Sequence, residues 1–391
     1  MKKIFKYLLY GLLATIFMII VLPYIISPVY DFLPSKPFSG QSYYNPYGGQ
    51  DSLWQISNFH AHSRSWGGLT DGKDSHVDTV IATYRQMGYT HIGISNYQKI
   101  TQLNIDGLAS IPTYEHGYNI KKRHHLCLGA KRVVWLDFIF AQTMSHKQFM
   151  LNRLRGTTDF LAINHPKFCD GFEEADFALL SNYDAVEVLN HYRTSIPHWD
   201  SALSSGYYAV LLANDDMHDV KGMGEIGVNL TMVNTSSIAR SDIIDALKAG
   251  RHYGVKVKRK PDENLQIKRE RNASLIRPKS IAMTGDTLCA IFNRKAAEIR
   301  FAGQDGKLRK TLSLTDFAKY VFAPDDTYIR IEIDDNEGNL YLFNPVIRTD
   351  AAQPANPNRF VVNVFDTSIK WILITLLIIL CGFFFLRRRM K

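Results

Sequence analysis

The sequence has few cysteines: its 391 residues contain four. Cys381 lies in an apolar run near the C-terminus, while Cys127, Cys169 and Cys289 are widely separated and form no CxxC pair. A disulfide framework needs an even set of regularly spaced cysteines. The sequence therefore excludes a fold held together by disulfides, and the cysteines neither support nor contradict export.

The central part of the chain has little net charge, although the whole protein carries +9. Residues 1–27 contain three lysines and no acid, and residues 370–391 contain five Lys and Arg and again no acid. Most of the charge therefore belongs to the two ends. A nucleic-acid binder needs its basic surface on the folded domain, and no strip of alternating aromatic and basic residues is present. Both absences speak against nucleic acid as a partner.

The two basic ends are also strongly apolar. Residues 7–26 contain no charge and are long enough to cross a bilayer as a helix, and residues 371–386 form a shorter run that the stem of Lys370 extends. We assign residues 1–27 and 370–387 as membrane helices. A cleavable signal peptide is the alternative at the N-terminus, but its apolar region would be shorter and no small-x-small site follows.

The position of the charges also predicts the topology. Lys and Arg flanking membrane helices stay in the cytoplasm. We therefore expect a protein of the cytoplasmic (inner) membrane with both termini inside and the domain between the helices periplasmic or extracellular.

Strand-like and helix-like segments alternate between residues 52 and 255. The helical patterns cover 77–87, 146–154, 172–180, 199–206 and 241–250, and the strand patterns 53–58, 90–95, 160–164, 185–189 and 209–213. This alternation predicts a parallel α/β barrel or sheet rather than a sandwich.

The segments around this core differ in composition. Residues 28–51 and 351–369 are rich in turn-forming residues and are expected to be spacers. Residues 256–280 carry many Lys and Arg, which is typical of a solvated linker or of a segment attracted to anionic lipid headgroups. Residues 281–350 show a period of two with Gly-containing turns, which predicts a small β-sandwich domain.

Two histidines follow the first strand of the core, in the stretch NFHAHS. Two residues apart on an extended chain, His60 and His62 project to the same face. Such a pair suits Zn, Mn or Fe. The next stretch, RSWGGLTDG, contains a Gly-Gly turn that would let Asp71 fold back over the same place. Two ordinary surface or core histidines are the alternative for this pair taken alone.

Metal-type residues recur at the ends of other predicted strands. They are Glu115, His125, His165, Glu187, Asn190, Asp216 and His218. Barrel active sites form at strand ends. Several strand ends that all carry His, Asp or Glu predict a multinuclear metal site.

These motifs, taken in order, resemble a known family. FHAHS…TDG, GYTHIGIS, YEHG, HHLCLG, AINHP, AVEVLN and DDMHD are similar to the PHP (polymerase and histidinol phosphatase) metallohydrolase superfamily over residues 57–253. The resemblance implies a distorted (β/α)7 barrel with two or three divalent metals at its mouth and phosphoester hydrolysis. The β domain that follows resembles the C-terminal module of membrane or secreted members. The expected architecture is thus α/β, a barrel followed by a small β-sandwich and flanked by two transmembrane helices.

The resemblance also implies which residues hold the first two metals. The ligands would be His60, His62, Glu115, Asp216, His125 and His165, with Glu115 bridging both metals. His125 fits the spacing to Gly129 better than His124 or His116, which stay open as alternatives.

A third metal position departs from the family's pattern. Asp71 and His218 match two of its ligands, but the Thr-Asp-His triplet that supplies the other reads SNY at residues 95–97. Tyr97 would bind as a phenolate, or only pack or hydrogen-bond. Two ligands are too few to hold a Zn- or Mn-type ion firmly. We therefore expect two tightly bound metals and a third that is weak, absent or recruited with substrate.

Further roles are expected around the metals. Two metals sharing Glu115 would activate a bridging water and hold phosphate oxygens, and His218 would protonate the leaving alcohol. Glu187 and Asn190 would orient a ligand histidine. The candidate phosphate-binding cations are Arg64, Lys167 and Arg193, with an ordinary solvated cation as the alternative for each.

The sequence therefore predicts a membrane-anchored, metal-dependent phosphoesterase outside the cytoplasmic membrane. Its cofactors would be two or three divalent ions of Zn, Mn or Fe, and its substrate a phosphoester on a lipid headgroup or a small periplasmic molecule. One alternative is a non-catalytic metal-binding or sensing protein, favoured by the change at residues 96 and 97. The other is a nuclease-type family member, disfavoured by the charge distribution.

Overall fold

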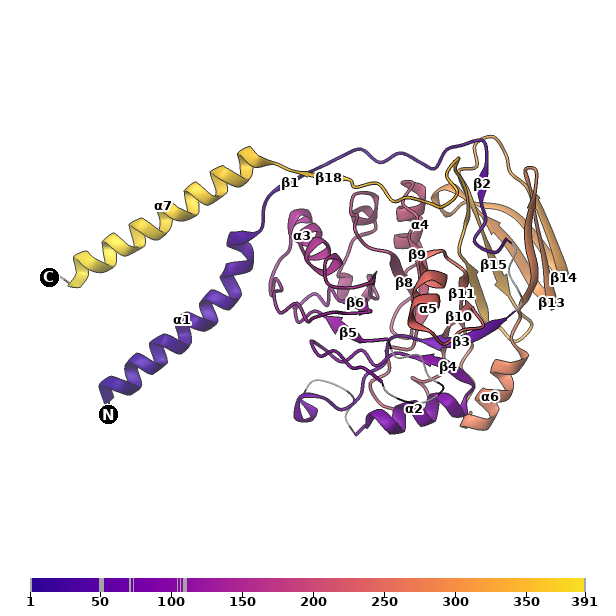
Figure 1. The fold of residues 1–391 in the computed structure, drawn as a ribbon, viewed down its shortest axis with the longest axis horizontal. Coiled ribbons are helices and arrows are strands. Elements are labelled where there is room, and N and C mark those ends of the chain that lie inside the picture. The colour runs from indigo at the N-terminus through magenta and orange to yellow at the C-terminus, as the bar shows by residue number, and fades with distance from the viewer. Residues whose placement is uncertain are drawn as a thin grey trace.

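Two long apolar helices leave the body of the protein on one side (Figure 1). The computed structural model describes residues 2–48, 53–69, 72, 74–103, 105, 107 and 111–389. The helices are α1 (Lys2–Ile26) and α7 (Val364–Arg389). Their apolar parts, Lys3–Ile26 and Val364–Phe384, have mean hydropathies of 2.4 and 2.1 and are long and apolar enough to cross a membrane. The expected apolar helix at each end is confirmed.

The two helices are joined where they meet the body. Lys370 Nζ donates a hydrogen bond to the carbonyl of Tyr24 (3.0 Å). Beside this contact, β1 (Tyr30–Phe32) pairs antiparallel with β18 (Phe360–Val362). Both helices are therefore held to the same side of the body.

The segments expected to be free spacers lie against the body as straps. Residues 28–48 run along it to β2 (Tyr43–Tyr44), which pairs with β17 (Val346–Arg348) near its far end (Figure 1). In the second segment, Arg359 is buried and donates to Ser205 Oγ (2.7 Å). The spacer expectation is wrong in this respect, because short strands and a few buried side chains hold both segments in place, although most of their residues are exposed.

A five-stranded sheet carries most of the candidate site. Its strands, in spatial order, are β5 (Thr113–His116), β6 (His125–Leu128), β7 (Phe160–Ile163), β8 (Ala185–Asn190) and β9 (Val210–Asn214). β7, β8 and β9 run parallel, whereas β5 pairs antiparallel with β6, and β6 with β7. Every residue of these strands is buried, which explains the nearly continuous apolar sequence of β7 and β9.

A larger sheet of eleven strands lies beside the first. Its main path runs β12 (Pro278–Thr284), β13 (Thr287–Ala302), β15 (Tyr328–Asp334), β16 (Leu340–Phe343), β11 (His252–Lys256), β10 (Asn229–Asn234), β3 (Trp54–Asn58) and β4 (Tyr89–Ile92). β14 (Leu308–Val321) pairs with β13. β3 and β4 are parallel, and the other pairs along this path are antiparallel.

The two sheets do not close into the expected barrel over the residues that the structure describes. β9 of one and β10 of the other meet through a side chain: Thr231 Oγ1 accepts from the N–H of Ala213 (3.0 Å) and donates to its carbonyl (2.8 Å). The antiparallel pairs in both sheets interrupt the repeated parallel βα unit from which a (β/α) barrel is built. The fold is mixed α/β, as expected, but open.

The helices of the core lie close to their expected positions. They are α2 (Val77–Gln86), α3 (Met144–Arg155), α4 (Ile196–Ser204) and α5 (Arg240–Lys248). Residues 172–180 form only a short 3-10 turn, Glu174–Ala178, instead of a helix.

The expected basic linker contains a further helix, α6 (Leu265–Ser274). Lys268 is buried and donates to the carbonyl of Ile226 (2.6 Å), and Arg271 pairs with Glu263 (2.6 Å). Buried cations are tolerated when carbonyls and carboxylates satisfy them. The prediction of a solvated linker over 256–280 is wrong for this helix.

The C-terminal strands also differ from expectation, because they continue the larger sheet. β16 pairs with β11 from Tyr253↔Phe343 to Lys256↔Leu340. Ile299 from β13 lies in the same buried cluster as Tyr253. The 281–350 segment is therefore joined to the core by hydrogen bonds and by a shared apolar interior, and it does not form a separate sandwich.

Candidate metal centre

Strands of both sheets point their ends at one buried place. β3 from the larger sheet leads to His60, β5 carries Glu115, and β9 leads to Asp216. The backbone links these ends beyond the strands: His62 N donates to the carbonyl of Met217, and Asp216 N to that of His60, both at 2.8 Å. The side chains that follow the strands are thus held by main-chain hydrogen bonds.

The first candidate group consists of His60, His62, Glu115 and Asp216, which are all buried. One ligand atom from each lies within 4.8 Å of the others. His60 Nε2 is 3.1 Å from Asp216 Oδ1 and 3.3 Å from Glu115 Oε1. His62 Nε2 is 3.2 Å from Glu115 Oε2. Two imidazoles and two carboxylates at this spacing match a single divalent cation.

The second candidate group consists of Glu115, His124 and His165. Glu115 Oε1 is 3.0 Å from His124 Nδ1 and 3.3 Å from His165 Nε2. Asn164 Nδ2 donates to the same oxygen (2.9 Å). Glu115 therefore belongs to both groups, the position of a carboxylate that bridges two metals.

The structure brings His124, and not His125, to the second group. Consecutive residues of an extended chain point to opposite faces. The His125 ring packs near His116 (5.7 Å between centroids) and Phe172 (6.0 Å), away from Glu115. The preference for His125 is therefore corrected, because its spacing to Gly129 did not report the side on which the ring lies.

Glu187 holds a ligand histidine from behind. His60 Nδ1 donates to Glu187 Oε1 (2.9 Å), which leaves Nε2 facing the group. His165 N and Asn190 Nδ2 donate to the other carboxylate oxygen, both at 3.0 Å. Asn190 Nδ2 also lies 3.2 Å from Asp216 Oδ2. Glu187 and Asn190 therefore lie in the positions that the predicted role of orienting a ligand histidine requires.

His218 borders the first group at its open edge. Its side chain is 24% exposed, and its ring stacks on His62 (4.2 Å between centroids, 22° between planes). Its Nδ1 donates to the carbonyl of Asp216 (3.0 Å) and is 3.7 Å from Asp216 Oδ1. His218 is therefore next to the ligands without belonging to either group.

The expected third metal position is described only in part. Asp71 lies outside the described residues. The Tyr97 ring lies among the histidines, 4.7 Å from His62 and 5.3 Å from His124. Asn96 instead fixes the loop that follows His62, because its side-chain Oδ1 accepts a hydrogen bond from the backbone N–H of Ser63 (2.8 Å).

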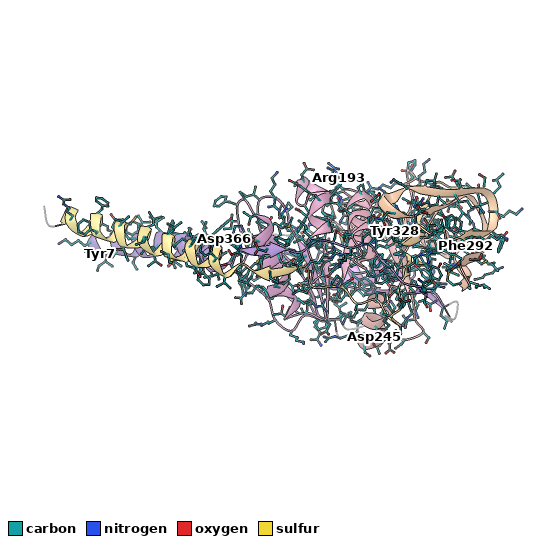
Figure 2. All side chains as sticks on the ribbon, turned by 90° about the horizontal axis from the view of Figure 1, so that it is seen from above. Tyr7, Arg193, Asp245, Phe292, Tyr328 and Asp366 are labelled. Atoms are coloured by element: carbon teal, nitrogen blue, oxygen red, sulfur yellow. The ribbon has the colours of Figure 1, made fainter. Side chains whose placement is uncertain are left out.

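The three candidate cations make contacts elsewhere. The contacts are Arg64 with Asp74 (3.2 Å), Lys167 with Asp170 (3.1 Å) and Arg193 with the carbonyl of Tyr192 (2.7 Å). Figure 2 shows Arg193 at the outer surface. None of these contacts involves the two groups, so a phosphate-binding role for these cations stays a prediction.

The electrostatics of the two groups favour ionised carboxylates. Burial alone would raise the pKa of Glu115, but His60 and His124 outweigh burial and hold that pKa well below its ordinary value. Burial would lower the pKa of His60, but Asp216 and Glu115 raise it well above the ordinary value. Without a metal ion, the two carboxylates favour the protonated form of His60. A metal ion bound by this group would replace that proton.

Unmet hydrogen bonds show that the residues fit a metal. His60 Nε2, Glu115 Oε2 and Asp216 Oδ1 are buried, and among the described residues they lie 3.1–3.3 Å from other members of the first group without forming aligned hydrogen bonds. Buried polar atoms without partners are costly. A divalent cation would satisfy all three atoms, and the mixed imidazole and carboxylate set suits Zn, Mn or Fe.

Backbone strain marks the same place. His165 and Asp216 have φ values of +27° and +50°, in the left-handed region that favours glycine. Strain of this kind persists at functional sites, where the surrounding structure enforces it.

Two residues with clear roles were missed by sequence reasoning. Asn164 donates to Glu115 and directly precedes His165, and this adjacency was the available signal. Asp215 precedes Asp216 but faces the other way, where it accepts from the N–H groups of Gly227 (2.6 Å) and of the next two residues.

No protein-family model matches the chain, and no curated protein does. Among solved structures, the chain is similar to a two-domain protein from Bacteroides vulgatus described as containing a predicted PHP-like metal-dependent phosphoesterase. The identity is 12% and the TM-score 0.42, over 81% of this chain and 98% of the other. A similarity this low carries no argument about function, which rests below on the geometry of the site.

Proposed function

We propose that the protein is a metal-dependent phosphoesterase whose centre binds two divalent cations. One observation carries the proposal: the buried carboxylate of Glu115 lies within reach of two separate sets of ligands, His60, His62 and Asp216 on one side and His124 and His165 on the other. A shared carboxylate between two N/O ligand sets is the arrangement of two-metal hydrolytic centres.

The bound cations would supply an activated water and neutralise the phosphate charge. In the hydrolysis, the water oxygen bonds to phosphorus, the bond from phosphorus to the leaving oxygen breaks, and the leaving alcohol takes up a proton. Glu187 and Asn190 orient His60 and Asp216. His218, at the open edge, is the group placed to exchange that proton.

We also propose that this centre works outside the cytoplasmic membrane. The basic residues at both ends support cytoplasmic termini. The two apolar helices leave the same side of the body, which agrees with that topology (Figure 1). The substrate would then be a phosphoester of a lipid headgroup or of a small molecule outside the cytoplasm.

The test uses the full-length protein in detergent. Elemental analysis should find about two metals per chain, and the protein should hydrolyse bis(p-nitrophenyl) phosphate or p-nitrophenyl phosphate with Mn or Zn. Glu115→Gln should lose metal and activity together, because both groups lose a charged ligand. Glu174→Gln, at an exposed position, is the matched control and should change neither.

Stoichiometric metal without hydrolysis of any phosphoester would instead identify a metal-binding or sensing protein. The ring of Tyr97 beside His62 and His124 keeps that second candidate open. Competition by single-stranded DNA would favour the nuclease.

A further inference from the structure

An aromatic pocket opens beside the second group of ligands. Its volume is about 370 Å³, and its walls include Trp66, Tyr97, Tyr118 and Trp135. The rings of Trp66 and Trp135 form a corner, with centroids 6.0 Å apart and planes at 72°. His124 also lines the pocket, so a molecule that fills it adjoins the candidate metal centre.

The pocket contains a buried side-chain amide that has no hydrogen-bond partner in the described part of the chain. Gln98 lines it and is 6% exposed, and neither its Oε1 nor its Nε2 has a hydrogen-bond partner among the described residues. Its φ of +50° lies in the left-handed region, which is uncommon for glutamine. A strained residue with unmet hydrogen bonds is costly to the fold. A ligand that forms hydrogen bonds with this amide would offset that cost.

Backbone contacts tie the pocket to the metal centre. Gln98 N donates to the backbone carbonyl of Glu115 (2.9 Å), the residue whose side-chain carboxylate belongs to both groups. Trp66 Nε1 donates to the carbonyl of Tyr97 (2.8 Å), whose ring lies 4.7 Å from His62. Since His124 both lines the pocket and belongs to the second group, the pocket adjoins the place where a phosphate would be held.

The lining indicates the kind of group that fits. Of the described residues that line the pocket, Lys122 alone carries a permanent charge, so these residues offer no carboxylate to bind a cationic group. Aromatic walls bind the faces of rings. The Gln98 amide offers one donor and one acceptor side by side, which matches a planar group with an adjacent acceptor and donor.

We propose, on the basis of the phosphoesterase function proposed above, that this pocket selects the leaving group of the substrate. The selected group carries a ring and an amide-like edge, with the ring against Trp66 and Trp135 and the edge on Gln98. Two sources carry a ring and an amide: the base of a nucleotide, which presents an acceptor and a donor on one edge, and an N-acetylated amino-sugar phosphate, whose trans amide presents one of them to Gln98 at a time.

The first test measures binding without hydrolysis. Uridine and N-acetylglucosamine are titrated separately against the full-length protein, with tryptophan fluorescence as the readout because Trp66 and Trp135 line the pocket. One of the two should bind. Gln98→Leu should weaken that binding about tenfold, the value expected for lost hydrogen bonds. Gln102→Leu, at an exposed position four residues on, is the matched control and should bind as the unaltered protein does.

The second test measures selection during hydrolysis. The matched pairs are uridine 5′-phosphate with ribose 5-phosphate, and N-acetylglucosamine 1-phosphate with glucose 1-phosphate. In one pair, the member with the amide-like edge should have a kcat/KM about tenfold higher. Gln98→Leu should remove that preference mainly through KM. Trp135→Ala truncates a side chain that is 59% exposed, so it should fold, and it should weaken the same preference.

The outcomes separate this inference from the proposed function. Hydrolysis of bis(p-nitrophenyl) phosphate without binding of either probe, or with a preference that survives Gln98→Leu, overturns the pocket's role and leaves the phosphoesterase standing. If no phosphoester is hydrolysed, the binding test decides alone. Binding lost in Gln98→Leu then supports the pocket, and absence of binding overturns it.

Discussion

At the scale of single residues, the candidate centre depends on which side of a strand each side chain occupies. His124 and His125 are neighbours, yet one ring reaches Glu115 and the other packs on Phe172. The same division occurs at Asp215 and Asp216, where one carboxylate binds backbone N–H groups and the other faces His60. In each pair the two neighbouring side chains point in different directions, and one of them faces the candidate centre.

The first prediction separates the two neighbouring histidines. His124→Gln should lower the metal content from about two per chain to about one, because the second group retains only Glu115 and His165. His125→Gln should keep both metals. Elemental analysis of the two purified variants, with circular dichroism as a check on folding, measures the difference. Loss of a metal in His125→Gln alone would return the ligand role to His125.

At the scale of elements, a partly buried cluster of charged side chains ties the C-terminal strands to the core. Arg330 on β15 pairs with Asp200 on α4 (2.9 Å) and with Glu332 on its own strand. Glu332 also accepts from Arg300 Nε on β13 (3.0 Å). Burial alone would raise the pKa of Glu332, but Arg330 and Arg300 outweigh burial and lower it.

The second prediction follows from the direction of this pKa shift. A carboxyl whose pKa is lower in the folded than in the unfolded protein stabilises the fold at pH values above its unfolded pKa, and this contribution is lost as the pH falls through the folded pKa. Glu332→Gln should therefore destabilise the protein by about 1–3 kcal/mol at neutral pH, with a smaller difference below about pH 4. Urea midpoints of both proteins across this range measure the effect. A difference that does not change with pH would rule out the charge as its cause.

The third prediction concerns the first strap. Gly206 has a φ of +76°, and an added Cβ would lie 2.0 Å from the carbonyl oxygen of Lys36. Gly206→Ala should therefore displace the strap and cost more than about 2 kcal/mol. Gly88→Ala is the matched control, because Gly88 has a similar φ of +88° with nothing within 4 Å, so its cost should stay near about 1 kcal/mol.

Urea midpoints give the two costs, and limited proteolysis between residues 28 and 48 reports release of the strap. Equal costs for Gly206→Ala and Gly88→Ala would mean that the strap does not press on Gly206 in solution.

At the scale of the whole molecule, the two apolar helices leave the same side of the body (Figure 1). The candidate centre lies in the body, between strands of both sheets. If the helices cross the membrane, the straps hold the body close to it, since they pair with one another and with the body instead of spanning a gap.

The fourth prediction tests this topology with reporter fusions. A phosphatase that works only outside the cytoplasm should be active when fused after Asn358, and a reporter that works only in the cytoplasm should be active after Lys391, because the flanking Lys and Arg stay inside. The reverse pattern at the two positions would invert the orientation.

The sequence by itself determined the parts of this protein that depend on local pattern. Apolar length predicted both terminal helices, helical spacing predicted α2 and α5, and the HxH motif placed His60 and His62 on one face. Strand ends bearing Glu115, His165 and Asp216 indicated a shared site, and the structure brings these three residues together. Local periodicity and residue chemistry are sufficient for such statements.

Only the tertiary structure decided the features that depend on contacts distant in sequence. Whether the two sheets close into a barrel depends on how the edges of β9 and β10 meet. Here the side chain of Thr231 on β10 bonds to the backbone of Ala213 on β9. Whether Lys268 is solvated depends on carbonyls more than 40 positions away. Which of His124 and His125 reaches the site depends on the exact position at which β6 begins. Spacing along the chain contains none of this information, because a hydrogen bond or an ion pair depends on the partner that folding brings near.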